Sequence, residues 1–262
     1  MSSIRESLST LKNVFFSTWK MKIFSLWLII AVFLEVLIIG ASRNEIFIGF
    51  VNFNFVIKEI KNQTNQLVVF ISVILCAISM LIFWLIREKL TKSIVKWEKK
   101  PSTKFILFGS LGALWVEFIF WLVEKLFGTE GVAASPNLIV DWLATMPWYI
   151  MMIALIWKIN TRYTYSLVEL ALFGGIYELC ADGVLGLVFK GQAAQIILLP
   201  LIFPIFVIVY SYMILPPTIL TRNEIEMANS VHLDREDSKK FKYGLLPLIG
   251  LIPYIFLFIL MI

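Results

Sequence analysis

Seven long apolar stretches with few charged residues constrain this chain more than any other feature of its sequence. They cover residues 21–41, 67–87, 105–128, 139–158, 165–190, 193–220 and 244–262. At about 1.5 Å of rise per residue, helices of these lengths cross the ~30 Å hydrocarbon core of a bilayer. The sequence therefore predicts an all-α fold, a polytopic transmembrane helix bundle of about seven spans.

The amino-acid composition points to the same class of protein. Apolar residues make up 60% of the 262 residues and charged residues only 16%. A soluble protein of this length could not bury so much hydrophobic surface. Seven spans with short connections also leave no room for a separate soluble domain. We therefore expect residues 1–262 to form one integral membrane domain of a multi-pass protein of the cell membrane.

The distribution of positive charge predicts the orientation of the chain. The largest cationic cluster follows the second stretch and consists of Arg87, Lys89, Lys92, Lys96, Lys99, Lys100 and Lys104. Because Lys and Arg accumulate in cytoplasmic loops, residues 88–104, residues 221–243 and the N-terminus are expected in the cytoplasm. The loop 43–66 and the C-terminus are expected outside, and residues 1–20 form either an interfacial helix or a flexible lead-in. The net charge of +5 follows from this topology and implies no nucleic-acid partner.

The fifth stretch carries small residues and carboxylates on one helix face. Ala171, Gly175, Glu178, Asp182 and Gly186 follow one another at steps of four, three, four and four. These steps keep them within about 80° of the helix circumference. Small residues let a neighbouring helix approach closely, so this face is expected to point into the protein. If the protein binds a metal ion, the pair Glu178 and Asp182 is the candidate ligand set.

The third stretch repeats this pattern of small and acidic residues. Gly109, Ala113 and Glu117 are spaced by four, and Glu124 follows seven residues later near the outer end. By helix length, Glu117 lies near the middle of its span, and Asp141 enters near the outer end of the fourth span. The acidic residues therefore gather at the midplane and in the outer half of the bilayer.

Five intramembrane carboxylates are the candidate proton- or cation-binding residues: Glu117, Glu178, Asp182, Asp141 and Glu35. No Lys or Arg in the central part of any span neutralises them. Ionisable residues inside a membrane are costly, which makes each of them a functional candidate. Two structural alternatives stay open. The carboxyls can be permanently protonated groups that hydrogen-bond between helices, and Asp141 can serve as a helix cap.

Several other chemistries lack the residues that they need. The single histidine, His232, lies in the charged segment 221–243, so haem held by paired histidines and a histidine-dependent zinc site have no ligands. Cys76 and Cys180 form no CxxC motif, and the chain has no phosphate-binding glycine loop. We therefore expect no cofactor.

Three functions are compatible with this pattern. The leading prediction is a small transporter or channel with a proton- or cation-binding carboxylate site in the outer half of the bilayer. One alternative is a membrane-embedded enzyme that acts on a lipid or isoprenoid through the same carboxylates. Another is an accessory subunit of a membrane complex. The expected partners are the lipid bilayer, a small ion or a small or lipidic substrate, and either a membrane protein or a second copy of the chain.

Overall fold

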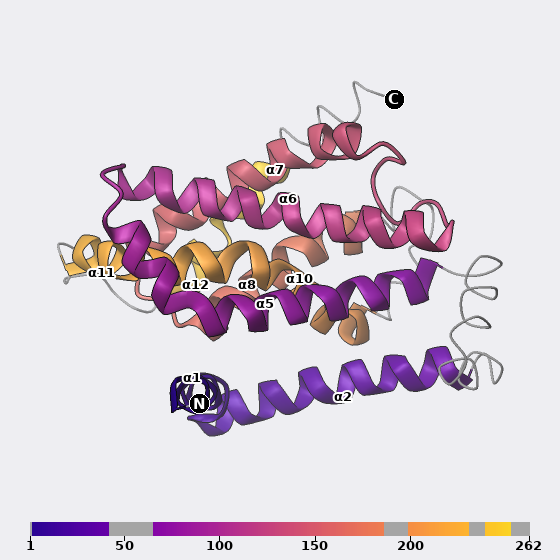
Figure 1. Cartoon of the computed structure of the whole chain (residues 1–262), viewed down its shortest axis with the longest axis horizontal. Coiled ribbons are helices and arrows are strands. Elements are labelled where there is room, and N and C mark those ends of the chain that lie inside the picture. Colours follow the sequence, from indigo (N-terminus) through magenta and orange to yellow (C-terminus); the bar gives the residue numbers. More distant parts are fainter. Residues whose placement is uncertain (1, 42–64, 186–198, 231–238, 253–262) are drawn as a thin grey trace.

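The computed structural model describes residues 2–41, 65–185, 199–230 and 239–252, and these are helical with short connections (Figure 1). The α-helices are α1 (Ser2–Phe16), α2 (Trp19–Ala41), α5 (Asn65–Val95), α6 (Pro101–Phe127), α7 (Leu138–Asn160), α8 (Leu167–Glu178), α10 (Leu199–Leu220), α11 (Arg222–Ser230) and α12 (Lys240–Gly244). A π-helix, η1 (Leu179–Leu185), continues α8, and a 3-10 helix, η4 (Leu246–Gly250), follows α12. The prediction of an all-α fold is confirmed for the described residues.

Four helices of the described chain are long and apolar enough to cross a membrane. They contain the segments Leu67–Val95, Pro101–Phe127, Leu138–Asn160 and Ile202–Leu220. The segments Ser9–Phe16 and Met21–Leu34 meet at an angle of 100°. If the two cross the membrane together, they form a fifth span. This arrangement is that of a membrane protein, with four to five candidate spans in the described residues where the sequence predicts about seven.

The difference arises mainly at the fifth and seventh predicted spans. The stretch 165–190 has only twelve α-helical residues before the helix widens into η1, and 186–198 lies outside the described residues. The stretch 244–262 begins with the end of α12 and with η4, because Pro247 lacks the N–H that an α-helix would need there. Residues 253–262 lie outside the description.

The connections between spans are shorter or more helical in the structure than the sequence predicts. α5 continues to Val95 and α6 begins at Pro101, so only residues 96–100 link the two. Lys, Arg, Glu and Leu are good helix formers, and a helix need not end where it leaves the apolar region. Within 221–243, α11 and α12 are helical. Nearly all of the predicted outer loop 43–66 lies outside the described residues, as does His232.

Helix α10 forms the centre of the bundle. In its apolar segment 72% of the residues are buried, against 33–39% in the other three spans. It packs against α8, α6 and α5, and its Met213 and Ile214 are fully enclosed. A helix that is apolar all round is expected to be buried rather than to lie at a surface.

Glycines allow α10 to approach its neighbours closely. A Cβ atom on Gly112 of α6 would lie 2.8 Å from the carbonyl oxygen of Tyr212, and one on Gly175 of α8 would lie 2.4 Å from a methyl group of Val207. Such distances are shorter than any ordinary contact, so a larger residue cannot occupy either position without movement. The prediction that the Gly175 face points into the protein is confirmed.

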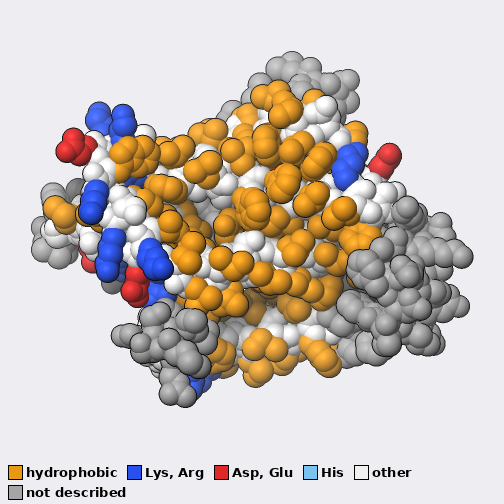
Figure 2. All heavy atoms as spheres, in the orientation of Figure 1, with side chains coloured by type: hydrophobic (Ala, Val, Ile, Leu, Met, Phe, Trp, Pro, Cys, Tyr) orange, Lys and Arg blue, Asp and Glu red, His pale blue; other side chains and the backbone are white. Residues whose placement is uncertain are grey.

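Charged side chains gather at the ends of the bundle. Figure 2 shows a broad hydrophobic belt between two polar ends, with most Lys and Arg at the end where α11 and the α5–α6 connection lie. At this end the buried Lys104 side chain forms an ion pair with Glu224 of α11 at 3.5 Å. Helix α1 lies here too, perpendicular to α2 (Figure 1), as an interfacial helix would.

Residues 239–252 are attached to α8 by polar contacts. Tyr165 and Tyr177 donate hydrogen bonds to the carbonyl oxygens of Lys240 and Gly244, at 2.7 and 2.6 Å. Lys240 Nζ binds the Glu169 carboxylate at 2.8 Å, and Glu169 completes a capping box with Ser166. Burial alone would raise the pKa of Glu169, but the hydrogen bonds from Lys240 and Ser166 outweigh it and hold the pKa below its ordinary value.

This ion pair makes the attachment of residues 239–252 dependent on pH. A carboxyl whose pKa is lower in the folded protein stabilises the fold above its ordinary pKa and loses that contribution as the pH falls through the lowered value. We expect the hydrogen-exchange protection factors of residues 239–252, corrected for the intrinsic pH dependence of exchange, to fall below about pH 4 in the wild type. The Lys240→Gln variant should show lower protection already at neutral pH and a weaker pH dependence. Equal profiles for the two proteins would contradict this role, and Lys242→Gln, at an exposed position of α12, is the matched control.

Candidate functional site

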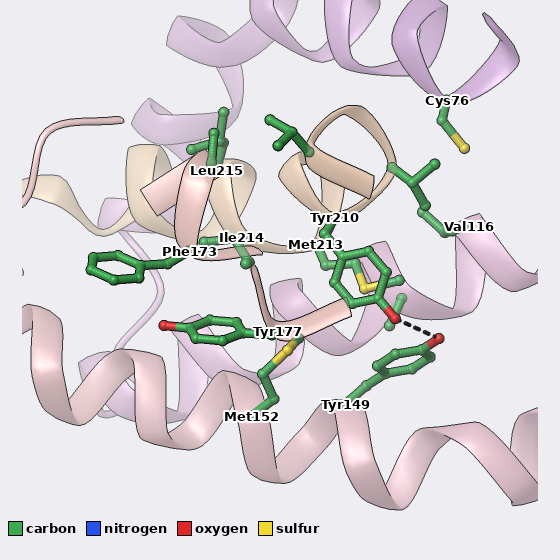
Figure 3. Packing of buried hydrophobic residues seen from close by; sticks show 14 of the residues in the cluster. Cys76, Val116, Tyr149, Met152, Phe173, Tyr177, Tyr210, Met213, Ile214 and Leu215 are labelled. Atoms are coloured by element: carbon green, nitrogen blue, oxygen red, sulfur yellow. Dashed lines mark hydrogen bonds between the residues drawn. The ribbon is translucent and has the colours of Figure 1, made fainter. Parts of the chain in front are cut away.

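Glu117 lies within α6 and ends a chain of hydrogen bonds that includes tyrosines of two other helices. Its side chain is 9% exposed, and the Tyr149 hydroxyl of α7 donates a hydrogen bond to Glu117 Oε1 at 2.5 Å. The Tyr210 hydroxyl of α10 donates in turn to the Tyr149 hydroxyl at 3.2 Å. Figure 3 shows this second bond and the edge-on contact of the rings, whose centroids lie 5.8 Å apart. We call Glu117, Tyr149 and Tyr210 the carboxyl–tyrosine chain.

Close packing encloses the carboxyl–tyrosine chain. Gly109 and Ala113, which lie two turns and one turn before Glu117 respectively, are buried on α6, and Gly109 packs against Ile153 of α7. Met152 of α7 and Met213 of α10 fill the space beside the tyrosines (Figure 3). The expected inward face of the third span is therefore confirmed, and the Glu117 carboxyl is held where the dielectric constant is low.

Asp141 brings a second carboxyl close to Glu117. It is fully buried in the first turn of α7 and accepts a hydrogen bond from the Ser135 backbone N–H at 3.2 Å. Glu117 is one of the neighbouring groups that interact with it. Asp141 Oδ2 is buried and has no hydrogen-bond partner among the described residues. Asp141 is therefore a second buried carboxyl near Glu117.

The helix cap of α7 is not Asp141 but Asn137. Asn137 Oδ1 accepts hydrogen bonds from the backbone N–H groups of Ile139 and Val140, at 3.0 and 3.3 Å. Asp141 lies one turn further along and complements the helix dipole only as a first-turn acid. The capping alternative for Asp141 is wrong in this respect, because Asn137 already occupies the position.

Glu124 has a structural role near the C-terminal end of α6. Its side chain is 1% exposed, and Oε2 accepts hydrogen bonds from the backbone N–H groups of Val132 and Ala133, both at 2.8 Å. These bonds fix the connection between α6 and α7. Glu124 therefore extends the acidic face of α6 as the sequence indicates, and its carboxylate supports the backbone that positions Asp141.

The remaining candidate carboxylates are separate from this group in the chain. Glu178 is buried at the end of α8, where the switch to a π-helix changes the angular spacing of the next residues. The side chain of Asp182 lies outside the description, so its predicted alignment with Glu178 is untested. The side chain of Glu35 also lies outside the description. Among the residues that are described, no group of three or more His, Cys, Asp or Glu is arranged to hold a metal ion.

Sequence analysis did not single out Tyr149 or Tyr210 as a candidate site residue. A usable signal was present on α7, where Asp141, Thr145 and Tyr149 follow one another at steps of four. That spacing puts the tyrosine on the face of the carboxylate. Tyr210 had no such signal, because its partner lies 61 residues away in the chain.

Comparisons with protein-family models, curated proteins and solved structures give no significant match for this chain.

Proposed function

We propose that this protein is a small transporter or channel of the cell membrane in which Glu117 binds a proton. The observation that supports this is a buried mid-span carboxyl in a hydrogen-bonded chain with Tyr149 and Tyr210. An ionisable group at this depth is costly and needs a partner or a proton. The tyrosine hydroxyls are neutral partners, so the charge on Glu117 changes whenever it gains or loses a proton.

The chemistry of the carboxyl–tyrosine chain suits proton movement. A hydroxyl group donates one hydrogen bond and accepts others, so Tyr149 can receive a proton from Tyr210 while it passes its own to Glu117. Asp141, a buried carboxyl in the first turn of α7, is a neighbour of Glu117 beside this chain of hydroxyls. Proton passage along such a line of side chains is a common device of membrane transporters.

The charge distribution supports an orientation for this site. Exposed Lys96, Lys99 and Lys100 lie at the α5–α6 end of the bundle, and the positive-inside rule assigns that end to the cytoplasm. Asp141 then belongs to the outer half, and the N-terminus is cytoplasmic. We also propose that residues 165–190 and 244–262 complete seven spans and leave the C-terminus outside.

Difference infrared spectroscopy of the protein in nanodiscs tests the proton site. We expect a carboxyl band that changes with pH, disappears in Glu117→Gln and shifts in frequency in Tyr149→Phe, because the hydroxyl no longer bonds to it. Glu226→Gln, at an exposed position of α11, should leave the band unchanged. A spectrum that is the same in Glu117→Gln and the wild type would overturn the proposal.

A further inference from the structure

A second candidate site lies beside α10, on a face of this helix other than the one that carries Tyr210. A cavity of about 220 Å³ is enclosed by α1, α2, α5, α8 and α10. Ser211 is the only lining residue with a hydroxyl group, and this hydroxyl donates a hydrogen bond to the Ile208 carbonyl oxygen at 2.7 Å. Water needs several polar partners to occupy a cavity, whereas this one has apolar walls. The natural occupant of such a space inside a bilayer is hydrocarbon.

The cavity opens toward lipid near the cationic end of the bundle. Ala77 and Leu81 of α5 line it and are exposed at its rim. Helix α1 crosses over it and contributes Leu11 and Phe15, and Lys12, the residue after Leu11, is exposed about 100° around the helix from Leu11, on the flank of the lining face. A lipid whose acyl chain enters between α1 and α5 therefore has its headgroup beside α1.

Positive charge lies next to the cavity at this end. Trp84 lines the cavity and is 5% exposed, and the Arg87 guanidinium lies 4.3 Å from the centre of its ring. Arg87 shares its charge with the exposed Glu88 at 3.4 Å, and Lys12 adds a second cation. Apolar walls together with two nearby cations match a lipid that has a negatively charged headgroup.

We propose that this cavity binds one acyl chain of an anionic phospholipid whose phosphate lies beside Lys12 and Arg87. The chain contacts Val207 and Leu215 of α10, the helix that also carries Tyr210. The site is independent of the proposed proton site, because none of its lining residues belongs to the carboxyl–tyrosine chain.

Photolabelling of the full-length protein tests this site. Nanodiscs of phosphatidylcholine would contain phosphatidylglycerol with a diazirine on one acyl chain, and labelled peptides would be identified by mass spectrometry. We expect labels on residues 9–16 and 77–84. The Ala77→Phe ring fills the cavity from its rim and should lower this labelling about tenfold, the effect of excluding about two chain methylenes.

Matched variants separate the cavity from the general lipid surface. Ile78→Phe adds a ring to the same helix at a residue that is 47% exposed and does not line the cavity, so its labelling should equal that of the wild type. Leu81→Trp, paired with Ile82→Trp, repeats the comparison if Ala77→Phe does not fold. Lys12→Gln should reduce the preference for phosphatidylglycerol over labelled phosphatidylcholine by about fivefold.

Three results would overturn the proposal. One is equal labelling of the wild type, Ala77→Phe and Leu81→Trp. Another is labelling spread evenly over the lipid-facing helices. The third is complete competition by a free fatty acid at the concentration of the phospholipid, which would identify a fatty-acid site instead.

Discussion

Proteoliposomes that contain the Glu117→Gln variant are expected to show no pH-driven flux above that of protein-free liposomes. Glutamine keeps the size of the side chain and its carbonyl oxygen can still accept the hydrogen bond from Tyr149, but an amide binds no proton at physiological pH. The loss should reach about a hundredfold or more, the effect of removing a positioned proton-transfer group. A pH-sensitive dye trapped in the liposomes measures the flux, with proton, sodium and potassium gradients imposed in turn.

The tyrosines should have a smaller effect on the same flux. Tyr149→Phe keeps the Glu117 carboxyl and removes only its hydrogen-bond donor, so we expect a decrease of about tenfold. Tyr212→Phe is the matched control, because it removes a tyrosine hydroxyl, on α10, that lies outside the carboxyl–tyrosine chain. Flux that survives in Glu117→Gln would contradict a role for this carboxyl in transport.

If proteoliposomes with the wild-type protein show no flux under any of these gradients, the transport function is contradicted. The infrared evidence that Glu117 binds a proton would still stand. An altered lipid composition in Glu117→Gln cells would then support the enzyme. Loss of a co-purifying membrane protein would support the accessory subunit. The infrared and flux measurements therefore separate proton binding from what the protein does with the proton.

The Gly112→Ala variant is expected to lose stability by about 2–3 kcal/mol, and Gly112→Val to lose more. The added Cβ would lie 2.8 Å from the Tyr212 carbonyl oxygen and 3.2 Å from Met213 Cα. Both atoms belong to the backbone of α10, which cannot rotate away as a side chain can. Separating α6 from α10 would disturb the packing around Tyr210 as well. Unfolding by SDS in mixed micelles, followed by circular dichroism, measures the change.

Two comparisons show whether the backbone contact is the cause. Gly109→Ala would place its methyl group 2.6 Å from Ile153 Cγ2, but this contact is to a side chain and not to a helix backbone, so the cost should be smaller than at Gly112. Leu111→Phe adds bulk at a residue that is 50% exposed and should have almost no effect. A Gly112→Ala protein as stable as the wild type would show that α6 and α10 do not approach so closely.

The helical membrane class follows from the sequence, and so do most helix positions and the buried face of α6. These properties are local: hydropathy requires only a run of about twenty residues, and a helix face requires only the period of 3.6. Gly109, Ala113 and Glu117 could therefore be assigned to the interior. The same local reasoning did not predict the π-helix that begins at Leu179, because nothing in the pattern there distinguishes a π-helix from an α-helix.

The partners of Glu117 depend on tertiary structure. Tyr149 lies 32 residues from Glu117, and Tyr210 lies 61 residues from Tyr149. Their meeting depends on how α6, α7 and α10 pack, which is decided by close contacts such as that at Gly112. The hydrophobic period of one helix does not show how a neighbouring helix is rotated about its axis or shifted along it. Sequence could therefore nominate a buried acid, while only the packed bundle could assign it two tyrosines and a neighbouring Asp141.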